Sequence, residues 1–259
     1  MKKESFQDDT DRINPYDSSD FVIVILRHMS KENHKILWKR CYDSVSHFYN
    51  PDQIYVIDDN SSLIDENDSI ILQNHLLHSE YKGAGEILPY YYFLKHKWAK
   101  KMAFLHDSMF MVRPFEDSEL RYKVIPIWHF STHSNDEITI EPYLLEKLIN
   151  HTELLLEYKK RIWNGCFGAA TIISLEAVEN IEKKYNAVTI LPTVLHNRKD
   201  RMALERIWGL LLYVENNISH TSLYGDIRKH PYAFKNSIPY QLYEERCTVH
   251  AICKTWSGR

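Results

Sequence analysis

An uninterrupted run of apolar residues, Phe21 to Leu26, most constrains the fold of this chain. A strand with one solvated face alternates apolar and polar residues. This run does not alternate, so we expect a strand buried on both faces, as in a parallel sheet. From Lys31 to about Tyr49 apolar residues recur at helical spacing, and Asn50-Pro51-Asp52 then ends the helix. Gln53 to Ile57 is a second short apolar strand, so the order predicts a βαβ unit with a right-handed crossover.

The rest of the chain continues this alternation of strands and helices. Further strands are expected at Ile70 to Leu77, Ala103 to Leu105, Tyr122 to Phe130 and at the end of the segment Ile162 to Ser174. Further helices are expected at Glu86 to Lys100, Glu141 to Lys160, Leu175 to Tyr185 and Arg201 to Val214. Residues 1–19 are polar and predict a loose N-terminal arm. The fold class that follows is α/β, with one central, mostly parallel sheet flanked by helices.

Composition narrows the classes of protein. The chain has 259 residues, of which 44% are apolar and 26% charged, so we expect a single domain over residues 20–259. Its apolar runs are far shorter than the roughly 20 residues of a membrane span, and no signal sequence is evident, which predicts a cytoplasmic protein. A net charge of −3 without a long basic run argues against a nucleic-acid partner. Four cysteines are few, which favours reduced, buried thiols.

Charged residues follow three of the predicted strands. Asp58 and Asp59 end one strand, Asp107 ends another, and Arg27 follows the first. In an open α/β sheet ligands gather outside the carboxyl ends of the strands. Acidic side chains there can hydrogen-bond a ribose or bind a hard cation. The alternative is that Asp-Asn-Ser after a strand is ordinary turn chemistry.

The order and spacing of three short motifs resemble nucleotide-sugar glycosyltransferases of the GT-A fold, in which two Rossmann-like halves abut. Val56 to Ser62 is similar to their nucleotide-binding corner, and Gly83 to Glu86, with Gly85, to their Gly-rich turn. Ala103 to Ser108 lies where the family carries its Asp-any-Asp metal motif. The resemblance covers roughly residues 20–115 and implies a nucleotide-binding half there, with residues 116–259 as the acceptor-binding half.

The metal motif departs from the family pattern, because His106-Asp107-Ser108 holds a single carboxylate. The resemblance implies Mn²⁺ or Mg²⁺, with Asp107 as one ligand and the late His250 completing the shell. Lys254 and Trp256 are similar to family residues near the diphosphate, where a cation stabilises the leaving group. The alternatives are that the site has lost its metal and that the C-terminus is a solvated basic tail. A zinc site formed by Cys247, His250 and Cys253 is a further alternative, but it lacks a fourth ligand.

Transfer to a hydroxyl also needs a general base. The resemblance implies an acid at the start of a late helix, and Glu205 and Asp200 are both candidates. Asp200 equally fits a helix N-cap, and Glu205 an ion pair across one helical turn. Trp163, Gly165 and Gly168 belong to a segment whose glycines let the backbone approach a ligand, similar to the family loop that faces donor sugar and acceptor. A tight turn into a strand is the alternative.

The leading hypothesis is a glycosyltransferase that moves a sugar from a nucleotide-sugar to a hydroxyl of a glycan, lipid or protein. The resemblance implies that it is metal-assisted and inverting. A sugar nucleotidyltransferase is the first alternative, and the absence of glycine from Arg27 to Glu32 disfavours it. A degenerate protein that binds a nucleotide-sugar or glycan without catalysis is the second, favoured by the single carboxylate at Asp107.

Overall fold

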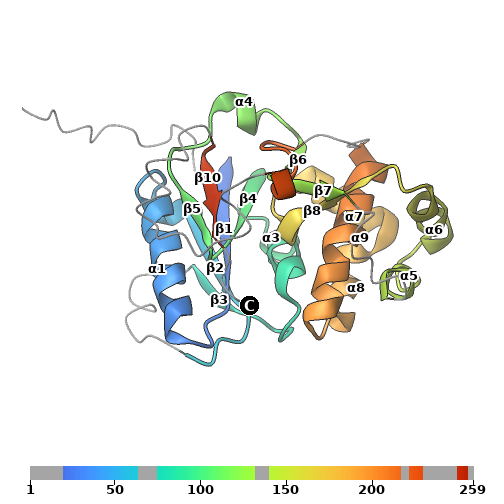
Figure 1. Cartoon of the computed structure of the whole chain (residues 1–259), viewed down its shortest axis with the longest axis horizontal. Helices are drawn as coiled ribbons and strands as arrows, with labels where there is room; N and C mark the ends of the chain where they lie inside the picture. The colour runs from blue at the N-terminus through green and yellow to red at the C-terminus, as the bar shows by residue number, and fades with distance from the viewer. Residues whose placement is uncertain (1–19, 64–74, 132–139, 217–221, 230–249, 256–259) are drawn as a thin grey trace, which may run out of the picture.

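The computed structural model describes residues 20–63, 75–131, 140–216, 222–229 and 250–255. Its centre is a six-stranded sheet in the order β3-β2-β1-β4-β9-β6 (Figure 1). The strands are Phe21–Arg27 (β1), Ile54–Asp58 (β2), Leu76–His78 (β3), Lys101–His106 (β4), Val124–Pro126 (β6) and Thr171–Ser174 (β9).

The sheet is mostly parallel. β1 pairs in parallel with β2 and β4, and β2 with β3, whereas β9 runs antiparallel to both of its neighbours. All seven residues of β1 are buried, which is why the sequence of this strand does not alternate. The predicted α/β class with one central, mostly parallel sheet is therefore confirmed.

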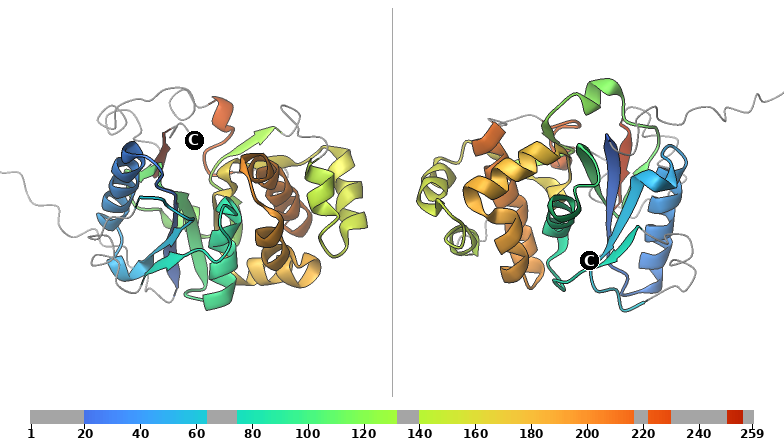
Figure 2. Two further views of the ribbon diagram at one scale, coloured as in Figure 1. Left: turned by 90° about the horizontal axis from the view of Figure 1, so that it is seen from below. Right: turned by 180° about the vertical axis from the view of Figure 1, so that it is seen from behind.

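Helices cover both faces of the sheet. α1 lies on one face, and α3 on the other, where it packs against α7 and α8 (Figures 1 and 2). A further pair, α5 and α6, packs on α9 at the far side of the molecule. Their bounds are Glu32–Ser46 (α1), Leu88–His96 (α3), Asp117–Leu120 (α4), Ile140–Leu145 (α5), His151–Lys160 (α6), Leu175–Tyr185 (α7), Ala187–Val194 (α8) and Arg198–Asn216 (α9).

Two small antiparallel sheets bring distant segments to the central one. β5 (Met109–Met111) pairs with β10 (Ile252–Lys254), which carries the C-terminal part of the chain back to the end of β4. β7 (His129–Ser131) pairs with β8 (Asn164–Cys166), and α9 packs on β8. Three short 3₁₀ turns also matter below: Gly85–Ile87 (η2), Phe167–Ala169 (η3) and Ile227–Lys229 (η4).

Several predicted elements are shorter than the sequence suggested. The expected helix Glu141 to Lys160 is two helices, because Asn150 takes a left-handed conformation with φ of 57° at the N-cap of α6. The expected helix Glu86 to Lys100 ends at His96, where Lys97 has φ of 51°. The expected strand Tyr122 to Phe130 is divided between β6 and β7, which belong to different sheets. Residues 70–74 of the strand expected from Ile70 lie outside the described residues.

The structure bears on the state of the cysteines and on the expected lack of membrane-spanning helices. Cys41, Cys166 and Cys253 are buried thiols, as predicted, and Cys247 lies outside the described residues. Among the helices of the described ranges, none has the length and apolar character needed to cross a membrane.

A buried ion pair joins β1 to β2 at the carboxyl end of the sheet. Arg27 and Asp58 are register partners, and Arg27 Nε donates to Asp58 Oδ2 at 2.7 Å. The two side chains are 1% and 4% exposed, and the guanidinium lies 4.7 Å from the ring centre of Trp38. Asp58 Oδ1 accepts the Ser61 N–H, so both carboxylate oxygens are satisfied.

We expect Arg27→Ala to lower the free energy of unfolding by about 3–5 kcal/mol, because the Asp58 carboxylate would remain buried and unpaired. Urea unfolding measures this. The matched control is Lys123→Ala, which removes an exposed pair with Glu176 and should cost at most about 1 kcal/mol. Equal losses in the two variants would contradict a structural role for the buried pair.

Candidate active site

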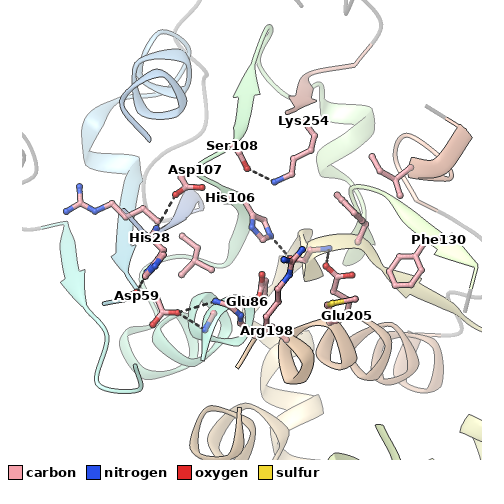
Figure 3. A pocket seen from close by; sticks show the side chains of 18 of the residues that line it. His28, Asp59, Glu86, His106, Asp107, Ser108, Phe130, Arg198, Glu205 and Lys254 are labelled. Atoms are coloured by element: carbon pink, nitrogen blue, oxygen red, sulfur yellow. Dashed lines mark hydrogen bonds and ion pairs between the residues drawn. The ribbon is translucent and has the colours of Figure 1, made fainter. Parts of the chain in front are cut away.

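The carboxyl ends of β1, β2 and β4 meet at one edge of the sheet, since these strands run parallel. A cavity of about 330 Å³ opens there, between this edge, η3 and the first turns of α9 (Figure 3). Its lining includes six cationic side chains, Arg27, Arg198, Arg201, Arg206, Arg228 and Lys254. It also includes four carboxylates, Asp59, Glu86, Asp107 and Glu205. Two of these cations, Arg27 and Arg206, are paired with carboxylates outside the lining, Asp58 and Glu141.

Asp59 ties the end of β2 to the start of the η2–α3 segment. Its Oδ1 accepts the Gly83 N–H at 2.7 Å and its Oδ2 the Gly85 N–H at 2.9 Å. Gly85 has φ of 62°, and a Cβ atom there would lie 2.3 Å from Arg201 Cδ. Glycine is therefore required at position 85 both by its left-handed backbone and by the close approach of Arg201. Burial raises the pKa of Asp59, against the opposing effect of these N–H groups and of Arg201.

The ends of β1, β4 and β10 are joined by hydrogen bonds. The His28 N–H donates to Asp107 Oδ2 at 3.1 Å, and His28 Nδ1 donates to the Asp59 carbonyl oxygen at 2.7 Å. Lys254 Nζ donates to Ser108 Oγ at 2.6 Å. The antiparallel pairing of β10 with β5 places Lys254 opposite Met109, so this late residue reaches the cavity.

Gly168 is held between His106, at the end of β4, and Glu205 of α9. His106 Nε2 donates to the Gly168 carbonyl oxygen at 2.7 Å, and the Gly168 N–H donates to Glu205 Oε1 at 2.9 Å. Gly168 has φ of 59°, and a Cβ atom there would lie 2.5 Å from His106 Nε2. The glycine that the sequence singled out thus lines the cavity, and only glycine fits there.

Glu205 is the most perturbed carboxylate of the cavity. Burial raises its pKa to about 8, and the neighbouring Glu86 adds to the increase, while the Gly168 N–H, Arg206 and Lys254 oppose it. A carboxylate poised near neutral pH in a cavity has the property that a general base needs.

The guanidinium groups of Arg206 and Arg228 both lie against the ring of Phe130. Their guanidinium carbons lie 5.3 Å and 5.5 Å from the ring centre of Phe130. Arg206 Nε lies 3.3 Å from the fully buried carboxylate of Glu141, whose other oxygen accepts the Tyr158 hydroxyl at 2.5 Å. This ion pair holds Arg206 in place, so Arg206 is suited to a structural role in the cavity wall.

Of the residues predicted from the sequence, Arg27, Asp59, Gly85, Asp107, Gly168, Glu205 and Lys254 line this cavity. Asp58 lies behind it, paired with Arg27. Trp163 packs at 5.8 Å on the Tyr158 ring, and Gly165 lies beneath Phe130. Asp200 accepts the N–H groups of His196 and Asn197, so it caps the start of α9 and does not line the cavity.

His250 lies four residues before Lys254, away from the cavity, and stacks at 4.2 Å on the Tyr224 ring. Trp256 lies outside the described residues. The structure therefore does not bring His250 to Asp107. Within the described part of the chain, no group of three or more His, Cys, Asp or Glu side chains is placed to hold a metal ion.

Sequence reasoning missed Glu86 and the arginines of α9 as cavity residues. Arg198, Arg201, Met202, Glu205 and Arg206 all line the cavity. Their spacing of three, four, seven and eight residues places them on one face of a helix. This spacing is visible in the sequence, but a charged face of a helix is more often exposed to solvent than part of a binding site.

No family model matches the chain, and no curated protein does. Among solved structures, the chain is similar to residues 1–349 of S. aureus TarS, a GT-A glycosyltransferase, at a TM-score of 0.42 and 12% sequence identity. The likeness covers 80% of this chain and 60% of that one, so the chain spans about 60% of the length of the solved structure. This structural similarity identifies no donor, acceptor or metal for the chain.

The raised pKa of Glu205 predicts a dependence of stability on pH. Between its ordinary value of 4.5 and about 8, the folded state binds a proton that the unfolded state releases. The free energy of unfolding therefore falls as pH rises through this window. Glu205→Gln removes this ionisation and keeps an acceptor for the Gly168 N–H.

We expect Glu205→Gln to gain stability relative to the wild type between about pH 5 and pH 8, by up to about 3 kcal/mol. Urea unfolding at both pH values measures the gain, with Glu176→Gln, an exposed site, as the control. A constant difference between Glu205→Gln and wild type across this range would show that the carboxyl titrates normally.

Proposed function

We propose that this protein is a glycosyltransferase that moves a sugar from a nucleotide-sugar to an acceptor hydroxyl with inversion. The observation that supports it most is the cavity at the carboxyl edge of β1, β2 and β4, which combines clustered cations with Glu205, a carboxylate whose pKa is raised to about 8. The GT-A resemblance of the sequence motifs at the same edge agrees with it. The sequence resemblance divides the chain into a nucleotide-binding half, residues 20–115, and an acceptor-binding half, residues 116–259; in this proposal the second half also supplies the cations that bind the diphosphate.

The cations are suited to the diphosphate of such a donor. Arg198 and Arg201 come from the first turn of α9, Arg228 from η4 and Lys254 from β10. When the sugar–phosphate bond breaks, its electron pair goes to the diphosphate oxygen. Fixed positive charges beside that oxygen lower the energy of the transition state, because they need not reorganise as charge develops.

Glu205 is suited to act as the general base of this transfer. Its carboxylate accepts the proton of the acceptor hydroxyl, the acceptor oxygen forms a bond to the anomeric carbon, and the diphosphate leaves on the opposite side of that carbon. Asp200 is not proposed for this role, since its carboxylate caps α9. The nearby His106 is proposed to hold Gly168, and through it the Glu205 carboxylate, in position.

A divalent metal, which the family resemblance implies, does not fit the described residues. Asp107 is a single carboxylate whose Oδ2 accepts the His28 N–H, and Ser108 accepts Lys254. His250 lies on Tyr224, away from the cavity. The proposed reaction therefore assigns the charge of the diphosphate to Lys254 and the arginines.

Nucleotide binding is the first test. Calorimetric titration with UDP, GDP and dTDP, and with hexose derivatives of each, should identify a nucleotide bound by the wild type. Arg198→Ala and Lys254→Met should each raise its Kd about 10- to 100-fold, since a charge-assisted hydrogen bond contributes about 1.5–3 kcal/mol.

Lys199→Ala is the matched control, because Lys199 is exposed, lies on the same helix and does not line the cavity. It should leave the Kd unchanged. Titrations with and without Mn²⁺ should give the same Kd. Binding that requires Mn²⁺ would restore Asp107 as a metal ligand, and no binding by any nucleotide would overturn the proposed donor.

Catalysis is the second test. With the donor found above and a panel of saccharide acceptors, Glu205→Gln should lower the rate of nucleoside diphosphate release about 10²- to 10⁴-fold. The Kd of the donor should stay within about twofold of the wild type. A wild-type protein that binds donor but releases no diphosphate with any acceptor would favour the alternative of a binding protein, and an equally active variant would remove Glu205 as the base.

A further inference from the structure

Glu86 lines the cavity beside Glu205 and has one unusual property (Figure 3). Its Oε2 atom is buried and has no hydrogen-bond partner among the described residues. Buried polar atoms nearly always have a partner, so this oxygen is open to a donor beyond the described residues, such as a bound ligand.

The local fold holds Glu86 in this place. It follows Gly85, whose N–H is bound by the Asp59 carboxylate, and it precedes Ile87 and Leu88, which are fully buried. Both sides of the residue are therefore fixed, by the carboxylate on one side and by the core on the other. The side chain is kept at the cavity wall, where burial raises its pKa.

The charges around Glu86 indicate what kind of group it meets. Arg201 and Lys254 attract the Glu86 carboxylate and Asp59 repels it, while Glu86 in turn raises the pKa of Glu205. An anionic phosphate is attracted to the cations and repelled by the two glutamates. The part of a ligand that meets Glu86 is therefore not the phosphate but a neutral group with an O–H donor.

We propose that Glu86 Oε2 accepts a hydrogen bond from a hydroxyl of the sugar that the nucleotide diphosphate carries, so that Glu86 selects the donor by its sugar. This inference rests on the proposed function. It divides the cavity in two: Arg198, Arg201, Arg228 and Lys254 bind the diphosphate, which every nucleotide donor shares, and Glu86 binds the sugar, which differs among donors.

The experiment compares a nucleotide with and without its sugar. UDP, GDP and dTDP and their glucose, galactose, mannose and N-acetylglucosamine derivatives are titrated calorimetrically into the full chain, first wild type and then Glu86→Gln and Glu86→Ala. The control is Glu176→Gln, whose carboxylate is 71% exposed and far from this lining. Thermal midpoints of the proteins without ligand are measured alongside.

We expect both Glu86 variants to bind the nucleoside diphosphate within about twofold of the wild type. The Kd of the selected nucleotide-sugar should rise at least about 10-fold, while Glu176→Gln binds both as the wild type does. The ligand-free Glu86→Gln protein should be at least as stable as the wild type, because it no longer buries a carboxylate that has one oxygen without a hydrogen-bond partner among the described residues.

Four results would overturn the inference. Unchanged nucleotide-sugar binding in Glu86→Ala would refute it and leave the proposed function intact. An equal loss of nucleotide and nucleotide-sugar, or a lowered thermal midpoint in Glu86→Gln, would show a structural role instead. Absence of binding by the wild type to any nucleoside diphosphate would remove the proposed function, and this inference with it.

Discussion

The site depends on the Asp59 carboxylate and the two N–H groups that it binds. Because Oδ1 holds Gly83 and Oδ2 holds Gly85, the turn after β3 is fixed to the end of β2. This contact brings α9 close, since Arg201 passes where a Cβ atom at position 85 would lie. It also sets the direction of Glu86, the next residue. One acidic side chain thus aligns the sheet edge, a helix of the opposite wall and an unpartnered carboxylate.

Most of the sheet followed from local pattern. The run from Phe21 to Leu26 predicts a doubly buried strand, and β1 is buried along its whole length. The pairing of β1 with β2 and β4 then brings the residues after each strand together, as the rule for α/β sheets requires. Asp59 and Asp107 therefore reached the cavity as predicted from sequence, because only strand direction and strand ends were needed.

What the sequence could not indicate depended on contacts between distant residues. Asp58 and Asp59 are neighbours of the same type, yet the first pairs with Arg27 inside the fold and the second faces the cavity. Alternation along a strand directs neighbouring side chains to opposite faces, but only the positions of Trp38 and Arg27 show which face lies inside the fold. Likewise a left-handed Asn150 divides a helix that its apolar spacing presents as continuous. Glu86 ends the Gly-rich turn of the resemblance, but that turn does not indicate the place of its side chain in the cavity, which depends on the packing of α9 on η2.

The distribution of ion pairs separates structural charge from charge that is available to a ligand. Arg27 is neutralised by Asp58 and Arg206 by Glu141, and all four side chains are nearly or fully buried. Breaking such pairs costs stability, so these arginines suit a role in holding the cavity walls. Arg198 and Arg228 are exposed at the rim, and Lys254 donates to the neutral hydroxyl of Ser108. An exposed cation can turn towards an anion without breaking a buried ion pair, which is why the diphosphate is assigned to the rim and the sugar to the interior beside Glu86.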